Sequence, residues 1–171
     1  SGPNDCWVDS DGAVYFTDPL YKRPYWNQVI PDDNPRGVYR VSAEGKLSKL
    51  VVDLKQPNGI VGDAVNRQIY VADISDGKTY RYRIDKNGQL TDRVLFCSMG
   101  SDGMTIDEKR NVYLTGRGVT VFNRDGKKIS NISVPRGWTA NVTFAGPERK
   151  HLFITAQDSV FVIKMNVAGL K

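Results

Sequence analysis

The sequence predicts an all-β protein of the β-propeller class, and three observations support this prediction. Four segments share one pattern, in which an Asn or Asp precedes a short apolar strand and a second strand follows about ten residues later. The segments begin at Asn4, Asn58, Asp102 and Asn141, at intervals of roughly 40–55 residues, which is the repeat length of propeller blades. No segment has the apolar period of an amphipathic helix. Because the first strand of each blade lines the central axis, we expect the four polar residues to recur around it.

The first unit covers residues 4–56 and contains a long interruption between its second and third strands. An Asp-Gly pair at 11–12 separates two apolar runs, which is a strong hairpin signal. The interruption, residues 18–36, holds four prolines together with Tyr21, Tyr25 and Trp26. Loops of this length are usually functional or disordered, and the aromatic residues favour a packed lid. We expect the strands of this unit at 6–8, 13–17, 37–41 and 47–54.

The second unit (57–100) and the third (101–138) are predicted to be complete four-stranded blades. Asp- and Asn-rich turns, most of them containing Gly, separate their apolar runs. The predicted strands are 59–62, 68–72, 78–84 and 89–97 in the second unit, and 103–106, 111–115, 118–123 and 127–134 in the third.

The fourth unit (139–171) is predicted to be incomplete. It has room for strands at 141–144, 151–156 and 159–166, and the sequence ends soon afterwards. The total is fifteen strands, or three and three-quarter blades, treated as one domain over 1–171. A propeller has to close, because open blade faces expose apolar surface and strand edges. The chain is therefore either a four-bladed ring with an imperfect seam or the C-terminal part of a larger ring. The second is favoured, because the chain starts abruptly inside a repeat.

Composition limits the classes of partner. No apolar run approaches the roughly 18 residues that span a bilayer, so we expect no membrane association. The net charge of +5 comes from basic residues scattered over predicted turns, which argues against nucleic-acid binding. Cys6 and Cys97 fall in strands of different units, and we expect buried free thiols, with a disulfide left open. The compartment stays undetermined.

Several short motifs, in their order and spacing, resemble the SMP-30/gluconolactonase family of lactonase-like six-bladed propellers, which includes regucalcin. The matching pieces are Pro3-Asn4-Asp5, Gly12-Ala13-Val14-Tyr15-Phe16-Thr17-Asp18-Pro19, Pro57-Asn58-Gly59-Ile60, Tyr70-Val71-Ala72-Asp73, Ser101-Asp102-Gly103-Met104 with Asp107, Asn141-Val142-Thr143-Phe144-Ala145-Gly146 and Leu152-Phe153-Ile154-Thr155-Ala156. The resemblance covers essentially the whole chain. It implies that rather more than two blades precede this segment, and that a glutamate ligand of the central metal lies there. This chain alone would then lack a complete metal site.

The resemblance also implies roles for individual residues. Asn58 and Asp102 match metal ligands, and their amide and carboxylate oxygens suit a hard divalent cation, most readily Ca²⁺, with Zn²⁺ or Mg²⁺ as alternatives. Asp102 also matches the candidate general base, although ligation would lower its basicity, and activation of water directly by the metal is the competing mechanism. Asn4 matches a residue that touches the substrate or the metal-bound water. Tyr21 in the long loop and Asn141 at the fourth repeat are the other candidate substrate contacts.

Simpler explanations exist for the same residues. Asn58-Gly59 and Asp102-Gly103 are also ordinary turn signals, and Asn141 would serve equally as a structural residue of the tunnel. His151 is the only histidine and starts a predicted strand, which favours a packing or surface role and argues against a His-based triad or a His-rich zinc site.

Two classes of function follow. The first is a metal-dependent hydrolase that opens a sugar lactone such as glucono-1,5-lactone. The second is a non-catalytic propeller that binds a ligand or a protein, and a fragment without activity is a third possibility. The open edge would be covered by the N-terminal blades or by self-association.

Overall fold

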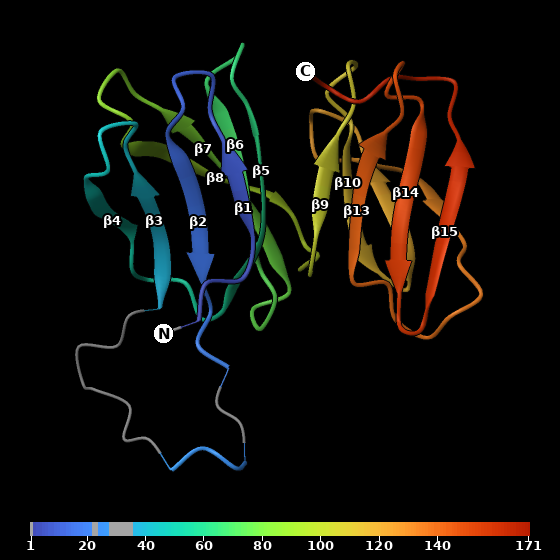
Figure 1. Cartoon of the computed structure of the whole chain (residues 1–171), viewed down its shortest axis with the longest axis horizontal. Coiled ribbons are helices and arrows are strands. Elements are labelled where there is room, and N and C mark those ends of the chain that lie inside the picture. Colours follow the sequence, from blue (N-terminus) through green and yellow to red (C-terminus); the bar gives the residue numbers. More distant parts are fainter. Residues whose placement is uncertain (1, 22–23, 28–35) are drawn as a thin grey trace.

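The computed structural model describes residues 2–21, 24–27 and 36–171, and these residues form an all-β structure (Figure 1). Fifteen strands make four antiparallel sheets in a propeller-like arrangement, and no helix occurs in the described part of the chain. It follows that the described residues contain no helix that could cross a bilayer.

Each sheet is a meander in which every strand pairs with the next one along the chain. The first sheet contains β1 (Cys6–Val8), β2 (Val14–Asp18), β3 (Gly37–Val41) and β4 (Leu47–Val51). The second contains β5 (Pro57–Asp63), β6 (Gln68–Asp73), β7 (Lys78–Ile84) and β8 (Leu90–Cys97). The third contains β9 (Met104–Ile106), β10 (Val112–Gly116), β11 (Gly118–Phe122) and β12 (Lys128–Ile132). The fourth has only β13 (Asn141–Ala145), β14 (His151–Ala156) and β15 (Ser159–Lys164), as predicted.

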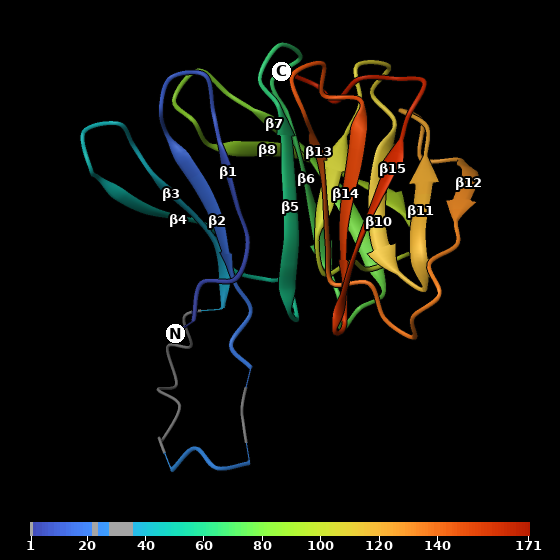
Figure 2. The same cartoon turned by 45° about the vertical axis from the view of Figure 1, so that its right-hand side comes forward.

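The first strand of each sheet contacts the first strand of the next sheet (Figures 1 and 2). These four strands, called the central strands below, are β1, β5, β9 and β13. Three apolar clusters fill the spaces between consecutive sheets. The first cluster joins sheets one and two around Tyr15 and Ile69, the second joins sheets two and three around Tyr70 and Leu114, and the third joins sheets three and four around Val119 and Ile154. Consecutive sheets are thus held by apolar packing, with the central strands at their inner edge.

The two outermost sheets each leave one apolar face uncovered by the described residues. On the fourth sheet Phe153, Val160 and Val162 are exposed. Phe153 lies opposite Val162 in the β14–β15 pair, so both side chains lie on the same face. On the first sheet Val8 and Leu47 are exposed in the same way.

Ion pairs connect the first sheet with the second, and the second with the third, at the C-terminal ends of β1 and β5. Arg67 donates to the buried Asp9 at 2.6 Å, and Arg110 donates to the buried Asp63 at 2.9 Å. In each pair the Asp follows or ends a central strand, and the Arg comes from the hairpin turn of the next sheet. Both arginines adopt positive φ, 52° and 65°, which is uncommon for residues other than glycine.

At the third junction a C-terminal segment takes the place of an ion pair. Gly169 pairs with Asp107 in an isolated β-bridge, and the Leu170 N–H donates to the Ile106 carbonyl at 2.9 Å. The Gly169 N–H also donates to the carbonyl of Arg149, in the hairpin turn of the fourth sheet, at 2.8 Å. The last residues therefore join the third and fourth sheets.

The cysteines only partly follow the sequence-based expectation. Both are free thiols, and Cys97 is buried, but Cys6 is exposed. The expectation of burial was wrong for Cys6 because its side chain shares a face with Val8, on the uncovered side of the first sheet.

Candidate functional site

Asn58 and Asp102, which lie 44 positions apart in the sequence, meet at one end of the central strands. The Asn58 Nδ2 donates a 3.0 Å hydrogen bond to Asp102 Oδ1. Asn58 is the second residue of β5 and is fully buried, whereas Asp102 lies just before β9 and is half-buried. Their side chains meet because the two central strands are neighbours and start at the same end.

A β-bulge presents Asn58. The register of β5 against β6 shifts between Pro57 and Ile60, which leaves Asn58 and Gly59 without paired residues on β6. The neighbouring sheets satisfy these groups. The Thr17 hydroxyl donates to the Asn58 carbonyl at 2.6 Å, and the Gly59 N–H donates to the Ser101 carbonyl at 3.2 Å. The bulge is therefore held from both sides, by the first sheet and by the third.

A carboxylate from the first sheet completes this arrangement. Asp5 Oδ2 accepts a 3.1 Å hydrogen bond from the Ile60 N–H, and its Oδ1 accepts one from the Cys6 N–H at 2.9 Å. The pKa of Asp5 is raised to about 6, mainly because the carboxyl group is buried. The hydrogen bonds from the Ile60 and Cys6 N–H groups lower this pKa, and the nearby Asp102 raises it. Sequence reasoning did not select Asp5, although it stands where the second and third repeats have Gly59 and Gly103.

The two glycines allow the close approach of neighbouring strands. A Cβ on Gly59 would lie 2.9 Å from the Asp102 carbonyl oxygen, and a Cβ on Gly103 would lie 2.2 Å from Asn141 Oδ1. Neither residue has a positive φ. Gly59 and Gly103 therefore serve packing between sheets, rather than the turn conformation that the sequence also allowed.

The segment that carries Asp102 is fixed by buried hydroxyl groups. Ser101 Oγ donates to the Gly103 carbonyl at 2.7 Å and accepts the Thr115 N–H at 2.8 Å. Thr115 Oγ1 accepts the Gly103 N–H at 2.9 Å. These contacts assign Ser101 a structural role.

Two aromatic residues flank the Asn58–Asp102 pair. The Asn58 Nδ2 also donates to the Tyr21 hydroxyl, and the Trp138 Nε1 donates to Asp102 Oδ2 at 3.1 Å. Tyr21 comes from the long loop after β2, whose residues 22–23 and 28–35 lie outside the described part of the chain. Tyr25 and Trp26 in the same loop are exposed, so Tyr21 is the aromatic residue of this loop that reaches the site.

The other two candidates lie near this pair without bonding to it. Asn4 is exposed just before β1, and its main-chain N–H donates to the Thr17 carbonyl at 2.9 Å. Asn141 is exposed on β13, rests on Gly103, and accepts the Val142 N–H on its own Oδ1 at 2.8 Å. Hydrogen bonds between described residues do not connect either side chain with Asn58 or Asp102.

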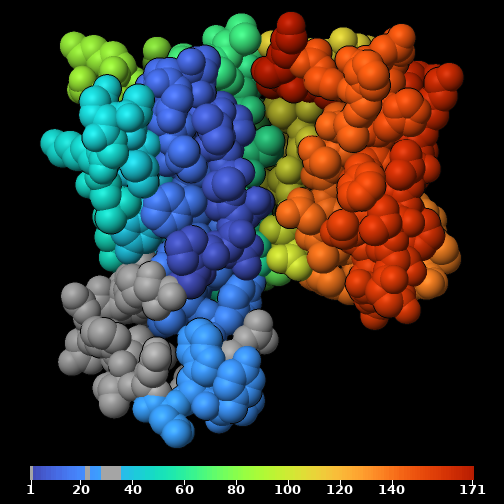
Figure 3. Space-filling view, viewed as in Figure 1, coloured from blue at the N-terminus to red at the C-terminus, as the bar shows by residue number. Residues whose placement is uncertain are grey.

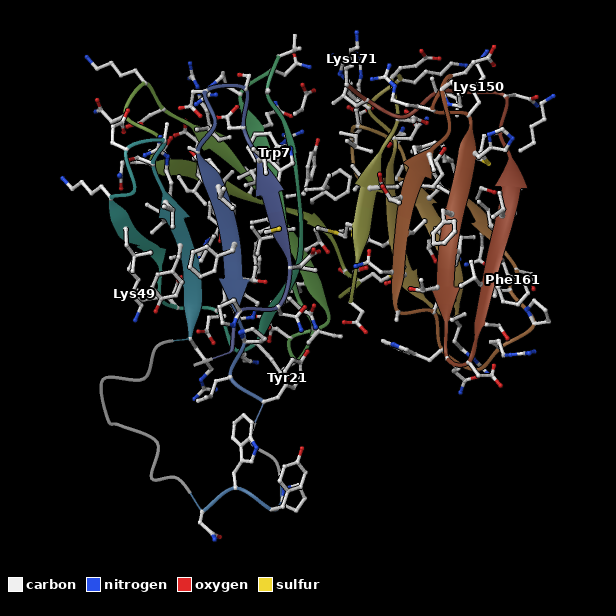
Figure 4. All side chains as sticks on the ribbon, in the orientation of Figure 1. Trp7, Tyr21, Lys49, Lys150, Phe161 and Lys171 are labelled. Carbon is white, nitrogen blue, oxygen red and sulfur yellow. The ribbon has the colours of Figure 1, made fainter. Side chains whose placement is uncertain are left out.

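A cavity of about 430 Å³ runs along the central strands. Residues of all four first strands, together with Leu170 and Lys171, line it, and it includes Asp5, Trp7, Ile60, Thr105 and Asn141. Tyr21 lies at one end of the strands and Lys171 at the other (Figure 4). The space-filling view shows the inner strands in a hollow between the first sheet and the fourth (Figure 3).

The donor atoms at Asn58 and Asp102 fit a hard cation only in part. Asn58 Oδ1 is buried without a hydrogen-bond partner among the described residues, and it belongs to the side chain that touches the Asp102 carboxylate. An unpartnered amide oxygen and a neighbouring carboxylate are suitable ligands for Ca²⁺, which takes six to eight oxygens in total. In this structure, however, the Nδ2 of Asn58 faces Asp102. The described residues contain no cluster of three or more His, Cys, Asp or Glu that could complete such a site.

Comparison with known proteins adds independent information. A family model described as "SMP-30/Gluconolactonase/LRE-like region" matches residues 1–158. The chain is 29% identical to a gluconolactonase of Zymomonas mobilis, over 99% of this chain and 52% of that protein. It is 24% identical to the pentonolactonase XacC of Haloferax volcanii, over 89% of this chain and 52% of the relative. The chain thus spans about half the length of these relatives.

Solved structures agree with these matches. A gluconolactonase of Xanthomonas campestris superposes with a TM-score of 0.83 at 30% identity, over 95% of this chain and 56% of that one. Regucalcin of Agrobacterium tumefaciens, described as a calcium-binding protein, gives a TM-score of 0.75 at 21% identity, over 98% of this chain and 62% of that one. The second likeness concerns the fold alone.

Proposed function

Because the chain belongs to the SMP-30/gluconolactonase/LRE-like family, we propose that the protein to which it belongs hydrolyses a sugar lactone to the corresponding hydroxy acid. The family's gluconolactonases and pentonolactonase act on lactones by name, and they support hydrolysis of a lactone in general. The observation that supports the proposal for this chain is the Asn58–Asp102 contact between the starts of two neighbouring central strands.

We assign Asn58 and Asp102 as two protein ligands of a divalent cation, most readily Ca²⁺, with Zn²⁺ or Mg²⁺ as alternatives. The unpartnered Asn58 Oδ1 supports this assignment, because it belongs to the side chain whose Nδ2 contacts the Asp102 carboxylate. When bound, such a cation polarises the lactone carbonyl and stabilises negative charge on its oxygen. Further oxygens, from water or from residues other than Asn58 and Asp102, would complete the coordination, since a hard cation takes six to eight oxygens.

Asp102 is also our candidate for the proton transfers. The oxygen of a water molecule bonds to the carbonyl carbon, and a carboxylate oxygen of Asp102 accepts a proton from that water. The bond between the carbonyl carbon and the ring oxygen then breaks, and the same proton passes from Asp102 to the ring oxygen. Atoms and charges balance, and the product is a hydroxy acid. Asn4, Tyr21 and Asn141 would contact the substrate around this pair.

The four sheets would then be part of a six-bladed ring. The uncovered apolar faces of the first and fourth sheets, together with the half-length coverage of the relatives, support this proposal. Two further blades would bury Val8 and Leu47 on one side and Phe153, Val160 and Val162 on the other.

The decisive experiment measures acid release from glucono-1,5-lactone by the intact protein, corrected for spontaneous hydrolysis. We expect activity that chelation removes and that added Ca²⁺ restores. Asp102→Ala should lower the rate by roughly 10²–10⁴-fold, the range for loss of a proton-transfer group. The matched control is Asp125→Ala, in the exposed β11–β12 turn, which should leave the rate unchanged. Undiminished turnover by Asp102→Ala would contradict the proposal, as would cation binding without any turnover.

A further inference from the structure

Trp138 is joined to the candidate site by a contact that the proposed reaction does not use. Its indole Nε1–H donates to Asp102 Oδ2 at 3.1 Å, while Asn58 occupies Asp102 Oδ1 at 3.0 Å. The two oxygens of one carboxylate thus face two different neighbours. Because each carboxylate oxygen has a donor from a different residue, Trp138 and Asn58 together restrain the orientation of the Asp102 carboxylate.

The main chain around Trp138 is fixed on both sides. The Thr139 N–H donates to the Gly116 carbonyl at 2.9 Å, and the Ala140 N–H donates to the Thr155 carbonyl at 2.8 Å. On the other side the Gly137 N–H donates to Gln157 Oε1 at 3.2 Å. The third and fourth sheets therefore set the position of the indole before any ligand binds, and little conformational entropy would be lost on binding.

The indole ring is partly exposed. Trp138 keeps 42% of its surface exposed and is not part of the three apolar clusters between the sheets. A single exposed apolar residue needs no explanation, but this one has its polar edge on a site carboxylate and its ring open to solvent. The C–H bonds on one face of a cyclic sugar form an apolar surface of matching size. A rigid aromatic wall beside a few polar groups is the usual composition of a small-molecule site.

We infer that Trp138 is a substrate-binding and positioning residue, whose exposed ring carries the face of a cyclic sugar lactone while its N–H holds Asp102 Oδ2. This inference rests on the proposed lactone hydrolysis for its substrate class. It adds a residue that sequence patterns did not select, since Trp138 stands outside the repeated Asn or Asp positions.

The test compares Trp138→Phe with Trp138→Ala in the intact protein, and each variant separates one part of the role. Trp138→Ala removes the ring, so KM for glucono-1,5-lactone should rise by roughly tenfold. Trp138→Phe keeps an aromatic ring and removes the N–H, so KM should stay within roughly threefold while kcat falls. Val65→Ala, which removes an exposed apolar side chain from the turn beyond the opposite end of β5, is the matched control and should change neither constant.

A second readout does not depend on turnover. 1,5-Anhydroglucitol has the same six-membered ring without the carbonyl, so it can bind but cannot be hydrolysed. We expect it to change the tryptophan fluorescence of the wild type and of Val65→Ala, and to change that of Trp138→Phe less, since Trp7 also lines the central cavity. Calorimetric titration should show that Trp138→Phe still binds this probe and that Trp138→Ala binds it roughly tenfold more weakly.

The outcomes distinguish the two proposals. Lactone turnover with equal KM, kcat and 1,5-anhydroglucitol affinity in wild type and Trp138→Ala would overturn the role of Trp138 and leave the proposed function standing. Binding of 1,5-anhydroglucitol that depends on Trp138, without turnover by the wild type, would support the sugar-binding role and overturn the hydrolase. Unchanged melting temperatures for both variants would confirm that any effect is local. If Trp138→Ala fails to fold, the kcat of Trp138→Phe decides whether the N–H contact matters.

Discussion

The Thr17 hydroxyl donates a 2.6 Å hydrogen bond to the main-chain oxygen of Asn58, across the junction between the first and second sheets. The same Oγ1 accepts the Asp5 N–H at 3.3 Å. One buried hydroxyl therefore connects the start of the first repeat with the candidate ligand of the second.

Thr17→Val should destabilise the protein by about 1–3 kcal/mol, because it leaves the buried Asn58 carbonyl without a donor. Thr17→Ser should retain most of the stability. The matched control is Thr155→Val, since Thr155 Oγ1 bonds the main chain of Asn141 within its own sheet and is only half-buried. Urea unfolding measures the difference, and equal losses at Thr17 and Thr155 would contradict the importance of the junction.

Gly59→Ala should disrupt the site by pushing the second and third sheets apart. The added Cβ would lie 2.9 Å from the Asp102 carbonyl oxygen and 3.3 Å from that of Ser101, and main-chain atoms cannot rotate away. We expect a loss of about 1–3 kcal/mol in stability and a fall in lactone turnover larger than this loss explains. Gly2→Ala is the control, because nothing lies within 4 Å of its Cβ position. Full turnover by Gly59→Ala would show that the close approach is dispensable.

Arg110→Ala should cost about 3 kcal/mol of stability, since it leaves the buried Asp63 carboxylate with Asn66 as its remaining side-chain donor. Arg124→Ala should cost less than about 1 kcal/mol, because its pair with Asp125 is exposed and 3.9 Å long. Chemical denaturation at neutral pH checks both values, and similar costs for the two substitutions would contradict this account.

Acid should weaken the same junction. Burial opposes ionisation of Asp63, but hydrogen bonds from Asn66 and Arg110 outweigh it and hold its pKa below 3.8. A carboxyl group whose pKa is lower in the folded state than in the unfolded state stabilises the fold at pH values above its unfolded-state pKa. This stabilisation is lost as the pH falls through the folded-state pKa. The gap in stability between wild type and Arg110→Ala should therefore narrow below about pH 4. A gap that stays constant to pH 3 would argue against an ionic contribution.

Asp5 should have the opposite pH dependence. Its pKa is raised from 3.8 to about 6, so between these values the folded state binds more protons than the unfolded state. The free energy of unfolding consequently falls as the pH rises through this window. Asp5→Asn keeps an oxygen acceptor for the Ile60 N–H and removes the buried charge. It should gain up to about 2 kcal/mol relative to wild type between pH 4 and pH 7.

Thermal unfolding at several pH values, in the presence of chelator, measures this gain. Asp125→Asn is exposed and should follow the wild type throughout. A pH-independent difference for Asp5→Asn would mean that its carboxyl group titrates normally.

The strands could be predicted from sequence because their signals are local. Short runs rich in apolar residues placed Gly37–Val41, Lys78–Ile84 and His151–Ala156 at their observed bounds. The Asp11-Gly12 turn was found in the same way, and Gly12 has the positive φ of 83° that such turns require. The absence of a fourth strand in the last unit also followed from counting local runs.

Local sequence patterns could not predict the features that depend on contacts between sheets. The β-bulge at Asn58 is stabilised by Thr17, Ser101 and Asp5, which are up to 53 positions away in the sequence. The indole of Trp138 meets Asp102 across 36 positions. The repeat position did single out Asn58 and Asp102, because equivalent positions of adjacent central strands lie side by side. Their roles as ligands stay predictions.

Among the described residues, the named strands pair only within their own sheets. The bonds that bring Asn58, Asp102, Tyr21 and Trp138 together run instead between sheets or from a loop. Mild heat or denaturant that loosens the packing between two sheets would therefore separate these site residues while the strands within each sheet remain paired. The far-ultraviolet spectrum would look intact at a stage when the chemistry has already stopped. Storage and assay conditions should accordingly be judged by turnover, since the spectroscopic signature of β-structure would be the last property to report the damage.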